Sequence, residues 1–207
     1  MDISDQDNRG QRVRRRIAID IDSTLHHYWD EVSRAARRRF GVDLPYDDQR
    51  TWAIPQLRPE QLRAVVAETH SAAAIARARP YPGAVDTVNG WHDAGHAILV
   101  MSQRAEACHD ATARWLSDIG LRYDDLDCAA DKIGRAVEAG IEVLIDDSPV
   151  NIARALEEGI VPATLLHPWN RDLCEDEEVV CAEDWRGLAV ALEPVLADDY
   201  DIARAID

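Results

Sequence analysis

Residues 17–24 read Ile-Ala-Ile-Asp-Ile-Asp-Ser-Thr, an apolar run that ends in two aspartates two positions apart, Asp20 and Asp22. A run of this kind is typical of a buried strand in a parallel sheet. The last residues of such a strand lie at the carboxyl edge of the sheet, where open α/β folds bind their ligands. Packing explains these two carboxylates poorly, because aspartate is almost never fully buried without a partner. We therefore expect Asp20 and Asp22 to take part in chemistry.

From residue 80 onward, short apolar strands alternate with amphipathic helices. Strands are expected at residues 96–102, 126–129, 141–145 and 161–166, and helices at residues 83–95, 105–119, 131–139, 148–158 and 185–196. Alternation of this kind indicates parallel strands that are joined by right-handed crossovers. The sequence therefore predicts an α/β fold with a Rossmann-like parallel sheet and helices on both of its faces.

The segment between the first strand and residue 80 has a different, helical character. An amphipathic pattern with an arginine-rich face covers residues 27–40 and ends at Gly41, and a second helix is expected from Pro59 to about Arg77. We interpret this segment as a small helical cap that is inserted after the first strand. The expected division is a disordered arm at residues 1–12, a core at residues 13–25 and 80–207, and a cap at residues 26–79.

Composition limits the classes of partner. The formal net charge of −16 argues against binding of long nucleic acid, which needs a basic surface. No stretch approaches the roughly 18 apolar residues of a membrane helix, and the N-terminus lacks the apolar core of a secretory signal. A small phosphorylated substrate remains compatible, because a bound cation can set the local field. We expect a cytoplasmic protein, and the sequence leaves open whether it acts as a monomer or a homodimer.

The cysteines favour the same compartment. None of the four has CxxC spacing, so we interpret them as reduced thiols, with a metal or redox role as the less favoured alternative. They are Cys108, Cys128, Cys174 and Cys181.

Polar side chains follow three of the predicted strands and begin one predicted helix. Ser102 ends the second strand, Lys132 begins a helix, and Asp146 and Asp147 end the fourth strand. The carboxyl ends of neighbouring parallel strands lie side by side, so these groups can converge with the first two aspartates. Several carboxylates on one edge repel one another unless a hard cation is present, and oxygen ligands favour Mg²⁺.

The remaining groups suit phosphoryl transfer. A lysine and a hydroxyl can hold the oxygens of a phosphoryl group, and this reaction depends mainly on positioning and charge neutralisation. One carboxylate can attack phosphorus to form an acyl-phosphate. A second carboxylate nearby can protonate the leaving oxygen and then activate water.

In order and spacing, Asp20-Ile21-Asp22-Ser23-Thr24, Ser102, Lys132 and Asp146-Asp147 resemble the four motifs of the haloacid dehalogenase-like (HAD) phosphatase superfamily. The resemblance covers roughly residues 15–167. Within that superfamily the chain is similar to the 5′(3′)-deoxyribonucleotidases and their bacterial relatives. The insert after the first motif, the Pro80-Tyr81-Pro82-Gly83-Ala84 stretch and the Asp-Asp-Ser-Pro-Val-Asn stretch at residues 146–151 carry this second resemblance.

The resemblance implies a role for each motif residue. Asp20 would be the nucleophile and Asp22 the general acid and base. Mg²⁺ would be held by the carboxylate of Asp20, the backbone carbonyl of Asp22 and the carboxylate of Asp146, with Asp147 ligating through water or orienting the site. Ser102 and Lys132 would bind the phosphate, and Tyr28 would help to hold a nucleobase. Ser23 departs from the family, since many members have glycine there, and Arg104 receives no role.

Each of these residues also has a simpler interpretation. Ser102 could cap the helix that follows it, Lys132 could lie on the surface, and Asp147 could serve only the electrostatics of a helix start. His26 and His27 are expected to face solvent or line the cap rather than bind a metal. Tyr28 and its aromatic neighbours Trp29, Phe40 and Trp52 could form the core of the cap. Residues 167–170 could border the site or pack a turn.

We therefore predict a Mg²⁺-dependent phosphomonoesterase that acts through an aspartyl-phosphate, most simply a 5′-nucleotidase on (deoxy)nucleoside monophosphates. The first alternative keeps this chemistry and changes the substrate to a sugar phosphate or another small metabolite phosphate. The second alternative is a non-catalytic binding protein with the same fold. Such a protein should lack the nucleophile or the metal-binding acid, and both Asp20 and Asp146 are present.

Overall fold

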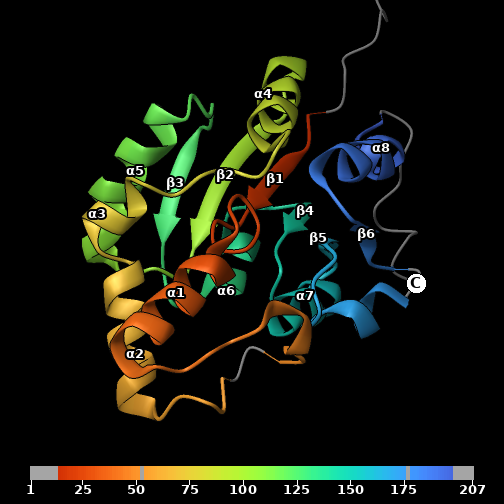
Figure 1. The fold of residues 1–207 in the computed structure, drawn as a ribbon. Coiled ribbons are helices and arrows are strands. Elements are labelled where there is room, and N and C mark those ends of the chain that lie inside the picture. The colour runs from red at the N-terminus through yellow and green to blue at the C-terminus, as the bar shows by residue number, and fades with distance from the viewer. Residues whose placement is uncertain (1–13, 52–53, 176–177, 198–207) are drawn as a thin grey trace, which may run out of the picture.

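The computed structural model describes residues 14–51, 54–175 and 178–197 of the chain. The predicted N-terminal arm, the aromatic Trp52 and the last ten residues of the acidic tail lie outside this part. The described chain forms a parallel sheet with helices packed around it, and a group of helices beyond one edge of the strands (Figure 1).

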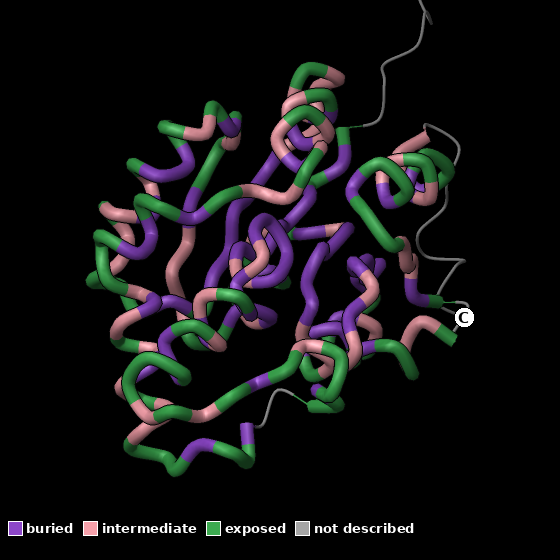
Figure 2. Tube along the Cα trace, in the orientation of Figure 1, coloured by how far each residue is buried: buried purple, intermediate pink, exposed green. Residues whose placement is uncertain are grey.

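The sheet has six strands in the order β3-β2-β1-β4-β5-β6, and every neighbouring pair is parallel. Their bounds are β1 (Arg16–Ile19), β2 (Ala97–Ser102), β3 (Asp125–Cys128), β4 (Val143–Ile145), β5 (Val161–Leu165) and β6 (Val180–Ala182). Strands β1, β2, β4 and β5 are buried along almost their whole length (Figure 2). Five strands were expected from the sequence, and the sixth is a short, half-buried edge strand whose apolar run is too brief to detect.

Two layers of helices cover the sheet, which confirms the predicted fold class. An apolar cluster joins β1, β2 and β4 to Val88 of α4 (Ala84–Ala94), Trp115 of α5 (His109–Asp118) and Leu188 of α8 (Trp185–Leu196). A second cluster packs the other face against Ile133 of α6 (Lys132–Glu138) and Ala155 of α7 (Pro149–Glu157). Burial of these faces supplies the main free energy that holds the layers together.

Residues 26–79 contain a group of helices, the cap segment, that has an apolar cluster of its own. Helix α1 (Tyr28–Phe40) packs on α2 (Pro59–Thr69), and both lie beyond the arrowheads of β2 and β3 (Figure 1). Trp29 and Val65 belong to this cluster, as does Trp169 from the core. The cap segment also contains η1 (Tyr46–Asp48) and α3 (Ala72–Ile75).

Two predicted helices are interrupted in the structure. The helix expected from Pro59 to about Arg77 ends at Thr69, and α3 begins after Ser71, whose Oγ accepts a hydrogen bond from the N–H of Ala74 at 3.3 Å. A serine with this N-cap geometry starts a new helix, so it breaks the expected one. The helix expected over residues 105–119 begins as the 3₁₀ turn η2 (Glu106–Cys108) and becomes α-helical only at His109.

The prediction of four reduced thiols is wrong for two cysteines. Cys174 of η3 (Arg171–Glu175) and Cys181 of β6 form a disulfide, while Cys108 and Cys128 are free. Strand β6, which carries Cys181, pairs with β5. The Cα atoms of Cys174 and Cys181 lie 5.6 Å apart, a separation that suits a disulfide. Spacing in the sequence could not show this approach, because the sixth strand was not expected.

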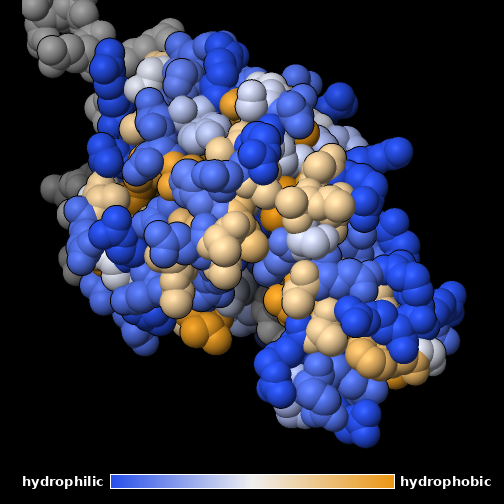
Figure 3. All heavy atoms as spheres, turned by 90° about the vertical axis from the view of Figure 1, so that its left-hand side faces the viewer, coloured by the Kyte–Doolittle hydropathy of each residue, from blue (hydrophilic) through white to orange (hydrophobic). Residues whose placement is uncertain are grey.

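Hydrophilic residues cover most of the face shown in Figure 3, in keeping with the net charge of −16. Among the described residues, no helix combines the length and the apolar character needed to cross a membrane.

Candidate active site

The first two aspartates lie where β1 ends and a tight loop begins. The N–H of Asp20 donates to the carbonyl of Ile145 at 2.8 Å, which places this residue beside the end of β4. The N–H of Leu25 donates to the carbonyl of Ile21 at 2.9 Å and closes the loop. Ser23 is the one described non-glycine residue with a positive φ, at 62°. The tight loop therefore forms even though serine stands where many HAD phosphatases have glycine.

Three carboxylates converge at this edge. One oxygen from each of Asp20, Asp146 and Asp147 lies within 4.8 Å of the other two, and all three residues are buried. Burial raises the pKa of Asp20 to about 7, with Lys132 opposing the shift and Asp146 adding to it. Burial and the charge of Asp20 also raise the pKa of Asp147 well above its usual value. Like charges held this close without water are costly, so the arrangement suits a bound cation.

Lys132 lies in the same cluster rather than on the surface. It is the first residue of α6, and Asp131 caps that helix by accepting from the N–H of Gly134 at 3.2 Å. Its Nζ donates to Oδ1 of Asp20 and, at 2.7 Å, to Oδ2 of Asp146. Burial alone would lower the pKa of Lys132, but the two carboxylates raise it above its usual range. The ammonium group therefore stays charged and links the two strand ends.

Neighbouring groups fix the acids at the end of β4. Asp146 accepts from the N–H of Ser148 at 2.8 Å and from Nδ2 of Asn151 at 3.0 Å. Oδ2 of Asp147 accepts from the indole N–H of Trp169 at 3.1 Å. Residues 167–170 thus border the site, and they also pack a turn, because the N–H of His167 donates to Oδ1 of Asn170. The two alternatives given from the sequence therefore both hold.

His167 joins the loop after β1 to the cap segment. Its Nε2 lies 2.8 Å from the carbonyl of Ser23, and its Nδ1 lies 2.6 Å from the hydroxyl of Tyr46. Burial lowers the pKa of His167 to about 4, so the ring is neutral at ordinary pH. A neutral ring that donates to the carbonyl from Nε2 accepts from the tyrosine at Nδ1, and this satisfies both nitrogens.

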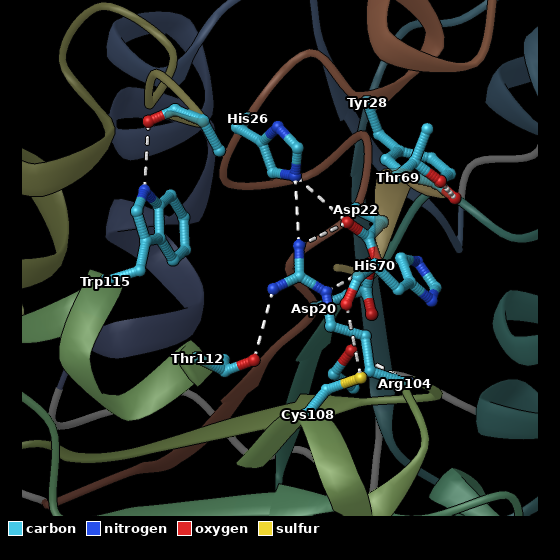
Figure 4. Close-up of polar contacts among 12 residues, drawn as sticks. Asp20, Asp22, His26, Tyr28, Thr69, His70, Arg104, Cys108, Thr112 and Trp115 are labelled. Atoms are coloured by element: carbon cyan, nitrogen blue, oxygen red, sulfur yellow. Dashed lines mark hydrogen bonds and ion pairs between the residues drawn. The ribbon is translucent and has the colours of Figure 1, made fainter. Parts of the chain in front are cut away.

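Asp22 has different surroundings from the three clustered acids. Its Oδ2 accepts from Nε of Arg104 at 3.0 Å and its Oδ1 from Nη2 at 2.6 Å, a two-pronged ion pair (Figure 4). Nε2 of His26 lies 2.9 Å from Oδ1, and Nε2 of His70 lies 3.3 Å from Oδ2. Burial alone would raise the pKa of Asp22, but Arg104 and the two histidines hold it well below its usual value. Asp22 is therefore a carboxylate near neutral pH.

A cavity of about 350 Å³ opens onto these groups. It is lined by Asp20, Asp22, Tyr28, Val66, His70, Gln103, Lys132, Asp146, Asp147, Ser148 and Asn151. Tyr28 belongs both to the cavity wall and to the apolar cluster of the cap segment, and its hydroxyl bonds Oγ1 of Thr69 at 2.7 Å. A second, larger cavity of about 850 Å³ lies between α1 and α2, and among its described lining residues there is none of the clustered acids.

Ser102 lies at the carboxyl end of β2, beside the site. It ends β2 with 1% exposure, and its Oγ accepts from the N–H of Arg104 at 3.2 Å. Gln103, the next residue, lines the cavity, while Ser102 is not among the lining residues in the described part of the chain.

Three side chains that contact Asp22 were missed by reasoning from sequence. The sequence analysis assigns Arg104 no role, although an arginine two residues beyond a predicted site serine is a usable signal. His26 was expected to face solvent or line the cap, but it is 3% exposed and contacts Asp22. His70 lies at the end of α2, and no sequence pattern connects it to the first strand. Its role depends on how the cap segment folds back over the sheet.

Comparisons with known proteins agree with this architecture. No family model and no curated protein matches the sequence. Solved structures do match. One is a putative phosphatase from Clostridium difficile, with a TM-score of 0.62 and 14% sequence identity; the match covers 86% of this chain and 98% of that one. Another is a HAD family hydrolase from Deinococcus radiodurans R1 with bound phosphate and sodium, with a TM-score of 0.60 and 16% sequence identity; the match covers 89% of this chain and 97% of that one.

The chain has the HAD hydrolase fold. A third structure with this fold is the D,D-heptose 1,7-bisphosphate phosphatase from B. bronchiseptica, complexed with magnesium and phosphate (TM-score 0.51, 14% identity, 88% of this chain and 98% of that one). At such identities the likeness concerns the HAD fold alone.

Proposed function

We propose that the chain is a Mg²⁺-dependent phosphomonoesterase that acts through an aspartyl-phosphate on Asp20. The observation that carries the proposal is the buried cluster of Asp20, Asp146 and Asp147 around Lys132, at the mouth of a cavity. Buried carboxylates with a lysine neighbour, at the carboxyl edge of a parallel sheet, suit phosphoryl transfer better than they suit a purely structural role. The proteins that share the fold include phosphatases, which supports the same conclusion.

The donor set fits Mg²⁺. Carboxylates of Asp20, Asp146 and Asp147 would supply hard oxygen ligands, together with the backbone carbonyl of Asp22. When bound there, the ion would neutralise the carboxylates and the charge on the transferred phosphoryl group. A structure with this fold contains magnesium and phosphate together, which supports the assignment of the metal.

The side chains then divide the reaction between them. An oxygen of Asp20 attacks phosphorus, the bond to the leaving oxygen breaks, and the departing alkoxide takes a proton from Asp22. In the second half, Asp22 takes a proton from water, the water oxygen attacks phosphorus, and the bond to Asp20 breaks. Lys132 lies against Asp20 and would hold a phosphoryl oxygen throughout. The contacts to Asp22 favour its carboxylate form, which is the form that activates water in the second half. The proton that Asp22 gives to the leaving group is the one that it took from water in the preceding turnover.

For the substrate, the resemblance to deoxyribonucleotidases favours a nucleoside monophosphate, with Tyr28 against the base. A sugar phosphate or another small metabolite phosphate is supported equally well. The cavity of about 350 Å³ is near the small end of the roughly 300–1,000 Å³ usual for ligand sites. One of the proteins with the same fold is a sugar bisphosphate phosphatase, whereas none of those reported above is a nucleotidase.

Phosphate release from nucleoside monophosphates, sugar phosphates and 4-nitrophenyl phosphate, with Mg²⁺ and with EDTA, tests the proposal. We expect turnover that needs Mg²⁺ and is abolished in Asp20→Asn. If only sugar phosphates are hydrolysed, the aspartyl-phosphate mechanism is supported and the assignment as a nucleotidase is rejected. Absence of turnover across the panel, or turnover that survives Asp20→Asn, would exclude the proposed mechanism and favour the non-catalytic alternative.

A further inference from the structure

Arg104 follows β2 and binds the proton-transfer carboxylate with both prongs of its guanidinium group. Nε and Nη2 donate to different oxygens of Asp22, at 3.0 and 2.6 Å (Figure 4). This parallel pairing fixes the plane of a carboxylate as well as its position, which a single hydrogen bond does not. The contact therefore determines where the oxygens of Asp22 point.

The arginine is itself held rigidly by the core. Its Nη1 donates to Oγ1 of Thr112 on α5 at 3.2 Å, and its Cζ lies 6.0 Å from the ring centre of Trp115. Arg104 is 2% exposed, whereas the side chain of Asp22 is 16% exposed and faces the cavity. Within this pair the guanidinium group is the fixed member, and the carboxylate is the member that it orients.

Stability does not account for such a pair. Removing two charges from water costs several kcal/mol, and replacing a buried ion pair by well-packed apolar residues is often neutral or stabilising. The surroundings include Trp115 and the apolar cluster beneath it, where an apolar side chain in place of Arg104 would find partners. A buried arginine beside a proposed site carboxylate therefore calls for a functional explanation.

The two oxygens of Asp22 are not equivalent. Each carboxylate oxygen can accept about two hydrogen bonds. Oδ1 accepts from Nη2 of Arg104 at 2.6 Å and lies 2.9 Å from Nε2 of His26, which itself lies 3.2 Å from the same Nη2, so Oδ1 is enclosed by these two side chains. Oδ2 accepts from Nε of Arg104, and its second neighbour, Nε2 of His70, lies 3.3 Å away, a longer contact than the one between His26 and Oδ1. Oδ2 therefore keeps capacity for a proton on the side of the cavity that His70 lines.

We propose that Arg104 is a positioning residue that aims Oδ2 of Asp22 at the hydrolytic water, and so sets the rate at which the aspartyl-phosphate is hydrolysed. The inference rests on the proposed function. In that step Oδ2 takes a proton from water, the water oxygen bonds to phosphorus, and the phosphorus–oxygen bond to Asp20 breaks. Inorganic phosphate leaves, and Asp20 is restored as a carboxylate.

The test separates formation of the phosphoenzyme from its hydrolysis. With 4-nitrophenyl phosphate the leaving group departs without needing a proton, so formation should not depend on Asp22. Arg104→Lys keeps the positive charge but loses the two-pronged geometry. In rapid-quench single turnovers we expect its phosphoenzyme to form at the parental rate and to decay about 10-fold more slowly. In the steady state kcat and KM should fall together, leaving kcat/KM unchanged.

Three further variants provide reference values for the rate of phosphoenzyme decay. Asp22→Asn should slow the decay by about 10²-fold or more, the usual contribution of a general base. Thr112→Val removes only the contact that anchors Nη1 and should give a smaller effect of the same kind. Arg114→Lys, at an exposed position on α5, is the matched control and should behave as the parent. Thermal unfolding of each variant reports whether the fold is intact.

The outcomes separate this inference from the proposed function. If the parent protein forms no phosphoenzyme, the proposed function fails. If it does, and Arg104→Lys leaves decay unchanged, the positioning role is overturned and the phosphatase stands. Equal slowing of formation and decay would assign Arg104 a merely structural role and would also overturn the inference. Slower decay at an unchanged formation rate supports it.

Discussion

Replacing Asp20 by asparagine should stabilise the protein in the absence of Mg²⁺, by an amount that grows with pH. The pKa of Asp20 is raised by burial from 3.8 to about 7. A carboxyl group whose pKa is raised in the folded state favours folding below its unfolded pKa, and that contribution is lost as pH rises through the folded value. The free energy of unfolding of the wild-type protein should therefore contain a contribution from Asp20 that falls between about pH 4 and pH 7. Asp20→Asn has no group that titrates at this position, so its free energy of unfolding should lack this decrease.

The size of the effect follows from the shift. One pKa unit corresponds to about 1.36 kcal/mol, so the interval from pH 5 to the folded pKa of about 7 amounts to about 2.7 kcal/mol. Lys132 keeps Asp146 as a partner in the variant, so no buried charge is left alone. The advantage of Asp20→Asn in unfolding free energy should be about 2.7 kcal/mol greater at pH 8 than at pH 5.

Urea denaturation in EDTA at both pH values measures this difference. Asp118→Asn, which neutralises an exposed carboxylate at the end of α5, provides the control and should show no comparable trend. If Asp20→Asn is no more stable than the parent at pH 8, or if its advantage does not change with pH, burial and the neighbouring acids do not make the Asp20 carboxylate as costly as the geometry requires. The reasoning that calls for a cation at this edge would then be refuted.

Four further outcomes are expected. Mg²⁺ at 100 times its dissociation constant should stabilise the wild-type protein by about 2.7 kcal/mol in urea denaturation, and Asp146→Asn should remove most of this gain. Lys132→Met should lower kcat for phosphomonoesters by about 10²-fold or more in steady-state assays, because an apolar side chain holds neither Asp20 nor a phosphoryl oxygen; a parental rate would move phosphate binding elsewhere. Trp169→Phe removes the hydrogen bond to Asp147 and should weaken Mg²⁺ binding about 10-fold in calorimetric titration, whereas an unchanged affinity would show that this acid needs no such support. Cys174→Ser opens a short loop and should lower the unfolding free energy by about 2–3 kcal/mol; a variant as stable as the parent would show that the disulfide adds nothing.

Patterns along the chain predicted five of the six strands and the acidic and basic residues at the carboxyl edge of the sheet, but not the short strand β6. Asp20, Asp146 and Lys132 follow or precede elements with clear periodicity, and parallel register brings the ends of β1 and β4 together without further information. Local rules therefore predicted both the layers and the carboxylate cluster.

The contacts of Asp22 could not be predicted in the same way. His70 approaches from the end of α2, and its position depends on Ser71 starting a new helix and on the packing of α1 against α2. Arg104 lies close to the predicted Ser102, but its partners come from the loop after β1 and from α5. Contacts of this kind arise from three-dimensional packing, which no local pattern records.

Trp169 connects the cap segment to one acid of the proposed metal site. Its indole ring lies 5.6 Å from that of Trp29 in the cap segment, and its N–H bonds the carboxylate of Asp147. A movement of the cap segment away from the sheet would break one of two contacts of Trp169, either its ring contact with Trp29 or its hydrogen bond to Asp147. In the proposed phosphatase, substitutions in the apolar cluster around Trp29 should therefore alter Mg²⁺ affinity through Trp169, although Trp29 supplies no ligand to the metal.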